Sequence, residues 1–337
     1  MSVRLAACGK VFLAGEYAVL EPGRPALVAG IDRKLHATAE PSASGLHILH
    51  APTGIAWDGG PPPPELRFAA RAAQLARTFC GTRAGIRIVV EDDLGIAGRK
   101  LGLGGSAAAS VLAVRAVCAA SGREVADAEV ISLALGAHWA EQEGSGSGAD
   151  VAAAALGGVL EVRARIPWRS VEELTAIPAV QIAASRPLEL RRVRVPSDLR
   201  LLLADAGSPA STRSLIREVR RFAEGDPRRW SKRAAGIAAA AEQLRDALES
   251  GDAESALAAV RSGASAMAAL GEDAQAPIVT PELARACALA SAAGAAGKPS
   301  GAGGGDCAVI VAFGDPARNR AEAALRPHFP VLRVAPA

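Results

Sequence analysis

The sequence is poor in several residue types, and each shortage argues against a class of protein. Only 3% of its 337 residues are aromatic, and Tyr17 is the single tyrosine. The 38 basic and 35 acidic side chains are mixed along the chain and leave a net charge of +3, which argues against a nucleic-acid-binding surface. The five cysteines are odd in number and show no CxxC spacing, so we expect buried free thiols rather than a disulfide framework.

Long apolar runs are also missing. The longest are rich in alanine and interrupted by charges, so none is expected to span a bilayer, and no signal-peptide pattern opens the chain. We therefore expect a cytoplasmic protein, a monomer or a homodimer, that binds a small molecule and neither nucleic acid nor membrane. Half of the residues are apolar and 22% are charged, which is typical of a globular protein with a large core.

Two common nucleotide-binding fingerprints, the Walker A loop and the dinucleotide-binding motif with its different glycine spacing, are absent as well. The Walker A pattern GxxxxGK[ST] does not occur, and in GAAGKPS at 294–300 a proline follows the Gly-Lys pair. The chain contains instead two other glycine-rich loops, GLGGSAAA at 102–109 and KPSGAGGGDC at 298–307, with GKVFLAGEYAVL at 9–20 and GSGSGADVA at 144–152. Glycines let the backbone approach a polyphosphate, and successive amides form an anion-binding concavity. Together these segments predict a phosphate-handling enzyme.

Periodicity predicts strands and helices in both halves of the chain. Strand-like runs occur at 4–8, 11–15, 26–31, 35–40, 46–50, 85–91, 158–165, 200–204 and 307–313. Helical spacing occurs at 66–80, 106–121, 127–142, from 150, at 211–224, 228–250 and 252–270, and from 281. Asp127 is expected to cap the third of these helices, and Thr280 the last. Because both element types occur in both halves, we predict an α+β fold.

The division between domains is expected in residues 166–198. Four prolines in this stretch bracket two runs that we interpret as extended. A chain of this length suggests about two domains, which we place at 1–187 and 188–337.

Three of these segments resemble a known family. Residues 10–20, 102–109 and 298–307 are similar, in this order, to the three signature motifs of the GHMP kinase superfamily, and the resemblance extends from about residue 5 to 313. It implies a two-domain fold, with an N-terminal mixed α/β nucleotide-binding domain, a ferredoxin-like α+β C-terminal domain and an active-site cleft between them. It also implies ATP and Mg²⁺ as cofactors.

Four segments resemble one branch of the superfamily. GEYAVLEPG at 15–23, GSGADVA at 146–152, GSPAST at 207–212 and the loop at 298–307 are most like the kinases that phosphorylate 5-phosphomevalonate to 5-diphosphomevalonate in the mevalonate pathway of isoprenoid biosynthesis. The alternatives are a mevalonate kinase or another small-alcohol kinase, and a catalytically inactive, ligand-binding regulator. A diphosphomevalonate decarboxylase is disfavoured, since its relatives do not normally carry the lysine found here at position 10.

Lys10 and Asp150 match the family's catalytic lysine and aspartate. The resemblance implies that Lys10 stabilises charge on the transferred phosphoryl group and that Asp150 orients Lys10 and the acceptor. A phosphate monoester is mostly ionised at neutral pH, so with such an acceptor Asp150 is expected to act chiefly electrostatically. A hydroxyl acceptor would instead require a general base. Taken alone, the two residues are equally compatible with a surface lysine and an ordinary helix-start aspartate.

The loop at 102–106 leads into a helix, whose N-terminus favours an anion. The family usually has two adjacent serines here, whereas Gly105 takes the first place in this chain and only Ser106 remains. Mg²⁺ ligands are expected from Ser106 and Glu141, with Glu143 as an alternative, while His138 is expected to be a packed or surface histidine. The predicted nucleotide-binding residues are Lys100, Gly102, Leu103, Gly104, Gly105, Ser106 and Ala107.

The acceptor is expected to contact polar and glycine residues from four segments. Tyr17 is predicted to hydrogen-bond substrate, with a core partner as the alternative. Ser211 and Thr212 form a polar cluster with Arg213 that suits an anionic group, although either hydroxyl would also suit a helix cap. Adenine contacts are expected in residues 50–80. The predicted substrate-binding residues are Tyr17, Ser145, Ser147, Ser211, Thr212, Arg213, Lys298, Gly301, Ala302 and Gly303.

Overall fold

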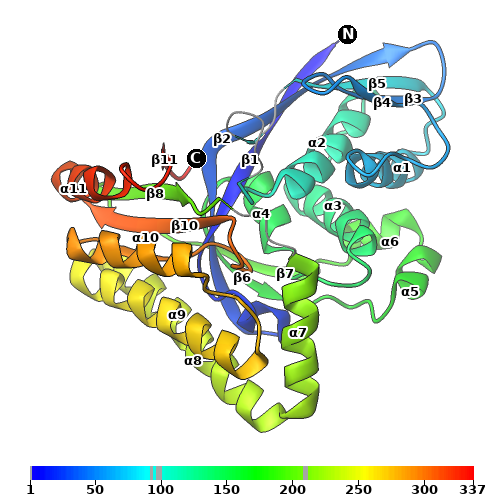
Figure 1. Cartoon of the computed structure of the whole chain (residues 1–337). Helices are drawn as coiled ribbons and strands as arrows, with labels where there is room; N and C mark the ends of the chain where they lie inside the picture. Colours follow the sequence, from blue (N-terminus) through cyan, green and yellow to red (C-terminus); the bar gives the residue numbers. More distant parts are fainter. Residues whose placement is uncertain (1, 92–93, 96–100, 208–211) are drawn as a thin grey trace.

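Two long antiparallel strands form the centre of the molecule. A computed structural model describes residues 2–91, 94–95, 101–207 and 212–337. In it β1 (Val3–Ala14) pairs with β2 (Pro25–Ser42), and the two run side by side through the middle of Figure 1. They belong to a seven-stranded sheet whose path is β4-β3-β5-β2-β6-β7, with β1 paired to β2 beside it. The other strands are β3 (Leu46–His50), β4 (Ile55–Trp57), β5 (Gly85–Val90), β6 (Gly158–Ala164) and β7 (Leu188–Arg192).

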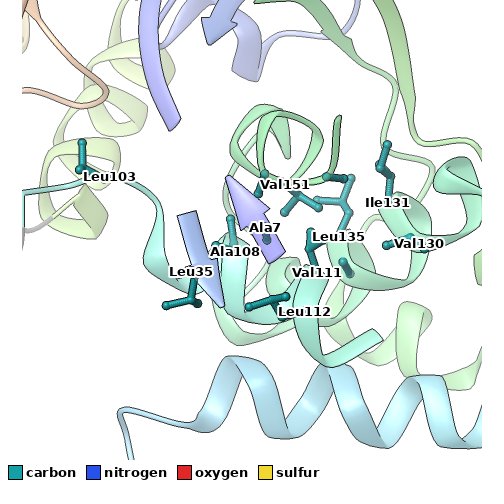
Figure 2. Close-up of a cluster of buried hydrophobic side chains, with 14 of the residues drawn as sticks. Ala7, Leu35, Leu103, Ala108, Val111, Leu112, Val130, Ile131, Leu135 and Val151 are labelled. Atoms are coloured by element: carbon teal, nitrogen blue, oxygen red, sulfur yellow. The ribbon is translucent and has the colours of Figure 1, made fainter. Parts of the chain in front are cut away.

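Four helices pack beside this sheet and form the larger core. They are α1 (Arg67–Cys80), α2 (Gly105–Ala120), α3 (Asp127–Glu141) and α4 (Ala149–Leu156). Helices α2 and α3 carry alanine, valine and leucine on nearly all sides, a pattern typical of helices buried all round. Figure 2 shows Val111 and Leu112 of α2 close to Leu135 of α3 and Ala7 of β1. This packing fixes the starts of α2 and α4, where the predicted phosphate loop and Asp150 lie.

The second half is built on a four-stranded antiparallel sheet. Its order is β11-β8-β10-β9, formed by β8 (Leu199–Asp205), β9 (Ala296–Pro299), β10 (Cys307–Phe313) and β11 (Val331–Val334). The helices between β8 and β9 are α7 (Thr212–Gly225), α8 (Pro227–Ser250), α9 (Ala253–Ala274) and α10 (Pro281–Ala292), and α11 (Asp315–Leu325) joins β10 to β11. Figure 1 shows α8, α9 and α10 lying together beside this sheet. The βαββαβ order confirms the predicted ferredoxin-like domain and, with the first sheet, the α+β fold.

Several predicted elements differ from the structure at their ends. The four runs predicted at 4–8, 11–15, 26–31 and 35–40 are two continuous strands, and the break predicted in the first coincides with a register shift at Cys8/Gly9. Asp127 is the first residue of α3 rather than its cap, and the Glu129 carboxylate accepts the Ala126 amide instead. Thr280 does cap α10, because its hydroxyl accepts the Leu283 amide at 3.3 Å.

The proline-bracketed stretch contains two short helices and one strand, so the prediction of two extended runs is only partly right. It forms the short helices α5 (Val171–Ala176) and α6 (Ala179–Ala184) before strand β7. Ser170 starts α5 by accepting the Glu173 amide at 3.2 Å. Because β7 pairs with β6 in the first sheet, we place the domain boundary between β7 and β8, a few residues after the predicted division at 187/188.

Two expectations about the chain as a whole can be compared with the described residues. None of the helices in the described ranges is both long and apolar enough to cross a bilayer. All five cysteines are free thiols, and burial raises the pKa of Cys307 to about 12.

Candidate active site

The predicted motifs converge on one cavity of about 630 Å³. Its wall is formed from both halves of the chain: β1 and the segment after it, the loop before α2, the loop before α4, and the β9–β10 hairpin. The start of α1, Ile216 of α7 and residues of the 50–69 region also line it. Residues as far apart in the chain as Lys10 and Asp306 therefore share a single site.

Lys10 is held between the two glycine loops. It is 8% exposed, and its ammonium group donates a hydrogen bond to the Gly102 carbonyl at 2.8 Å and lies 5.5 Å from the centre of the Phe12 ring. Its backbone amide donates to the Leu103 carbonyl, also at 2.8 Å. On the other side, a Cβ built on Gly301 would lie 3.7 Å from the Lys10 nitrogen. This position allows one cation to face ligands bound by either loop.

The loop at 102–106 is shaped by glycines that no other residue replaces easily. Gly102 and Gly104 have φ of +67° and +81°, a region that favours glycine. A Cβ on Gly104 would lie 2.7 Å from Cγ of Lys10, so the lysine fills the space that the missing side chain leaves. Helix α2 begins at Gly105 and directs its free amides toward the cavity, an arrangement that attracts an anion.

The predicted nucleotide-binding residues are mostly brought together by this loop. Gly102, Leu103, Gly104, Gly105 and Ser106 line the cavity. Ala107 does not line it, because its position in the first turn of α2 turns its side chain into the core. Lys100 lies outside the described residues.

Ser106, His138 and Asp150 meet at the cavity wall. The Ser106 hydroxyl lies 3.1 Å from Nε2 of His138, and Oδ2 of Asp150 lies 3.9 Å from the same nitrogen. His138 is 1% exposed and stacks against Phe68 with ring centres 4.9 Å apart. Burial lowers the pKa of His138, which Asp150 partly offsets and Lys10 reinforces. The imidazole is therefore neutral at physiological pH and is packed, as expected, but it also orients Ser106, a contact that the sequence did not predict.

The second glycine loop, at residues 300–306, forms the opposite wall. Ser300, Gly301 and Ala302 line the cavity, whereas a Cβ on Gly303 would meet the Ile278 carbonyl at 2.1 Å, so Gly303 serves close backbone packing. The Ser300 hydroxyl accepts the Phe12 amide at 3.1 Å. This contact was not predicted, although Ser300 lies within the motif.

The predicted substrate residues are placed unevenly. Tyr17 lines the cavity, but its hydroxyl donates to the Ala302 carbonyl at 2.5 Å, which is the core partner given above as the alternative. Ser147 also lines the cavity, whereas the Ser145 hydroxyl is used by the Gln142 carbonyl at 2.6 Å. Ser211 and the side chains of Thr212 and Arg213 lie outside the described part of the chain.

Lys298 corrects the sequence-based prediction. It is 0% exposed, does not line the cavity, and donates to the Glu16 carboxylate and to the Pro299 carbonyl. Its ammonium is therefore not available to a substrate phosphate. Glu16 belongs to the first motif and does line the cavity, although no role for it is predicted from the sequence.

Glu141 is also placed differently from the prediction. Its carboxylate accepts a hydrogen bond from Arg71 at 3.1 Å and lies 3.9 Å from Arg67, and it does not line the cavity. These cations neutralise it, so we withdraw it as a metal ligand. Ser106 and Asp150 do face the cavity and offer oxygen atoms, the ligands that Mg²⁺ prefers. Within the described ranges no group of three or more His, Cys, Asp and Glu side chains is placed to hold a metal, so a Mg²⁺ ion there would depend on nucleotide phosphates for most of its ligands.

The fold and the site define a kinase of the GHMP class, and comparison with known families agrees. The chain matches the GHMP kinases N terminal domain at residues 67–158 and the GHMP kinases C terminal domain at 244–331. It belongs to the GHMP kinase family. The N-terminal match contains α2 and Asp150, and the C-terminal match contains the second glycine loop at 300–306.

Two of the similar proteins are phosphomevalonate kinases. A phosphomevalonate kinase from Streptomyces sp. (strain CL190) is 33% identical over 345 residues, covering 92% of this chain and 90% of that protein. The crystal structure of the Lin0012 protein from Listeria innocua is 25% identical, with a TM-score of 0.84 over 100% of this chain and 99% of its own. The Streptococcus pneumoniae phosphomevalonate kinase in complex with phosphomevalonate and AMPPNP shares the fold, with a TM-score of 0.87, 21% identity and coverage of 98% and 99%.

Proposed function

We propose that this chain is a phosphotransferase that uses ATP and Mg²⁺ to convert 5-phosphomevalonate into 5-diphosphomevalonate, a step of isoprenoid biosynthesis. The observation that carries the reaction type is the position of Lys10, whose ammonium contacts the first glycine loop and faces the second. The choice of acceptor is supported by the 33% identity with the Streptomyces phosphomevalonate kinase. The five free thiols are in keeping with a reducing, cytoplasmic location.

Phosphoryl transfer depends on positioning and charge stabilisation more than on covalent chemistry. The amides at the start of α2 bind the nucleotide phosphates, and Lys10 stabilises the negative charge that is shared between donor and acceptor in the transition state. The attacking oxygen belongs to a phosphate that is already mostly ionised at neutral pH. Asp150 therefore orients the acceptor and Lys10 by its charge and removes no proton.

The charges of the cavity wall support a requirement for Mg²⁺. Among the described residues that line it, the carboxylates of Glu65, Asp150 and Asp306 outnumber the cations of Lys10 and Arg67, even when Glu16, which is paired with Lys298, is left out. Such a wall does not by itself attract a polyphosphate together with a second anion. A bound Mg²⁺ would neutralise charge on the β- and γ-phosphates, and Ser106 and Asp150 are the residues that would hold it.

A paired assay tests the proposal. ADP release is measured with 5-phosphomevalonate and with mevalonate as acceptors, under the same ATP and Mg²⁺ concentrations. We expect turnover with 5-phosphomevalonate and a kcat/KM for it that exceeds the value for mevalonate by at least about 10²-fold. The reason is that mevalonate lacks the charged phosphate group that the site would bind. A preference for mevalonate would make the protein a small-alcohol kinase. Binding of ATP without turnover of either acceptor would make it a regulator.

A further inference from the structure

Lys298 is a fully buried lysine at the junction of the two halves. It lies in β9, two residues before the second glycine loop at 300–306, and its partner Glu16 lies 282 residues away, two residues after the end of β1. The two side chains are 1% and 2% exposed. Helix α9 closes the space behind the lysine, because a Cβ on Gly263 would lie 3.9 Å from its Cε atom.

Glu16 is bonded on one side only. One carboxylate oxygen accepts from Lys298, while the other, Oε2, is buried and has no hydrogen-bond partner among the described residues. Glu16 also lines the cavity in which we place ATP and the acceptor. A carboxylate in this position repels both ligands, because charges interact strongly across a poorly hydrated wall.

Stability alone does not account for such a pair. Transferring two charges from water to the interior is costly, and apolar residues of similar volume often stabilise a protein as well or better. The first motif, to which Glu16 belongs, already contacts the second glycine loop through two hydrogen bonds, from the Phe12 amide to Ser300 and from Tyr17 to Ala302. The feature that only Lys298 supplies is its charge.

We propose that Lys298 is a positioning residue that cancels the charge of Glu16 at the cavity wall, so that the site accepts two anions. The same ion pair links the second glycine loop to the first motif. Lys298 contacts neither ligand and acts through Glu16. The inference rests on the proposed function only in that the ligands are anionic.

The test compares three variants by affinity and by stability. Affinity is the Kd for ADP with Mg²⁺, measured by calorimetry at pH 9 so that an unpaired Glu16 remains largely ionised. Lys298→Met leaves the carboxylate uncompensated and is expected to raise Kd about tenfold, the effect of one unit charge about 10 Å from another in a medium of dielectric constant about 20. Glu16→Gln leaves a cation instead and is expected not to raise Kd. Glu16→Gln combined with Lys298→Met is expected to return Kd to within about threefold of the unmodified protein.

Stability separates this role from simple packing. Both single variants leave one buried charge unpaired, so both are expected to lower Tm, although only Lys298→Met weakens binding. Arg245→Met is the control, because it removes a cation from the buried Glu161 carboxylate outside the cavity wall and is expected to leave Kd unchanged.

An unchanged Kd in Lys298→Met, or equal losses of affinity in both single variants, would overturn the inference. If Lys298→Met does not fold, the double variant decides: it contains no unpaired charge, and a Kd raised tenfold or more in it would contradict the proposal. Because ADP binding needs no turnover, a protein that fails the paired assay with both acceptors still tests the role of Lys298.

Discussion

The two glycine-rich loops have similar compositions but are held in place in opposite ways. The loop at 102–106 is fixed by one cavity-facing side chain, Lys10, through its ammonium and backbone amide. The loop at 300–306 is fixed by several separate contacts, with the Phe12 amide, the Tyr17 hydroxyl and the Ile278 carbonyl, which accepts the Gly304 amide at 2.9 Å. The first loop therefore depends on a catalytic residue for its shape, and the second on residues that need not touch ligand.

The difference predicts that substitutions at the two loops have effects of different size on catalysis. A change at the first loop alters phosphate binding and the position of Lys10 together, because the same atoms serve both. Removing one contact of the second loop is expected to lower activity less, because the other contacts that hold this loop stay in place. The predictions below test this contrast from the largest expected effect to the smallest.

Replacement of Lys10 by methionine is expected to have the largest effect. Methionine keeps most of the apolar stem but removes the charge and the hydrogen bond to the Gly102 carbonyl. We expect kcat to fall about 10²–10³-fold, the usual cost of removing one group that stabilises transition-state charge. Steady-state kinetics with 5-phosphomevalonate measure it. A variant that retains more than a tenth of the activity would remove Lys10 from the mechanism.

Gly104→Ala should produce the next largest loss. A Cβ at φ +81° is strained and would lie 2.7 Å from Cγ of Lys10, so the lysine must move. A displacement of about 1 Å at a catalytic group can lower the rate about 10²-fold, and we expect kcat to fall by that order.

Gly122→Ala is the matched control for Gly104→Ala. Gly122 has a similar φ of +66°, but a Cβ there would meet no atom within 4 Å, and it lies outside the cavity wall. Both variants should lose about 1–2 kcal/mol of stability from backbone strain, whereas only Gly104→Ala should lose activity. Equal kinetics in the two variants would show that the loop does not position Lys10.

The sequence predicted the first loop better than the second, for physical reasons. Lys10, Asp150 and residues 102–106 are recognisable because each stands in a local motif that resembles one of the family's motifs. The roles of Lys298 and Tyr17 depend on Glu16 and Ala302, which are 282 and 285 residues distant, and no local pattern encodes a pairing of that kind. The fold was predictable in class, because apolar periodicity marks most elements. Helices α5 and α6 were missed because two short turns among prolines carry little periodic signal.

Asp150→Asn tests how the acceptor is activated. The amide keeps the shape and can still accept from the Val151 amide, as Oδ1 does at 2.9 Å. If the acceptor is an ionised phosphate, only an electrostatic contribution is lost, and we expect kcat to fall about tenfold at pH 7.5. A fall beyond about 10³-fold would indicate general base catalysis and would favour a hydroxyl acceptor, since such catalysis typically contributes about 10²–10⁴-fold. The same measurement with mevalonate is the internal comparison.

Tyr17→Phe is expected to have the smallest effect, and it decides between the two roles given to that hydroxyl. The variant keeps the buried ring and removes only the hydrogen bond to the Ala302 carbonyl of the second loop. We expect a loss of about 0.5–1.5 kcal/mol in the free energy of unfolding, measured with urea, and a change in KM for 5-phosphomevalonate of less than about threefold. Ser300→Ala removes a neighbouring contact of the same loop. If both contacts hold one structure, the losses in the free energy of unfolding should not be additive in the double variant. A rise in KM of tenfold or more with unchanged stability would instead assign the hydroxyl to the substrate, and the second loop would then resemble the first in being shaped by a group that touches ligand.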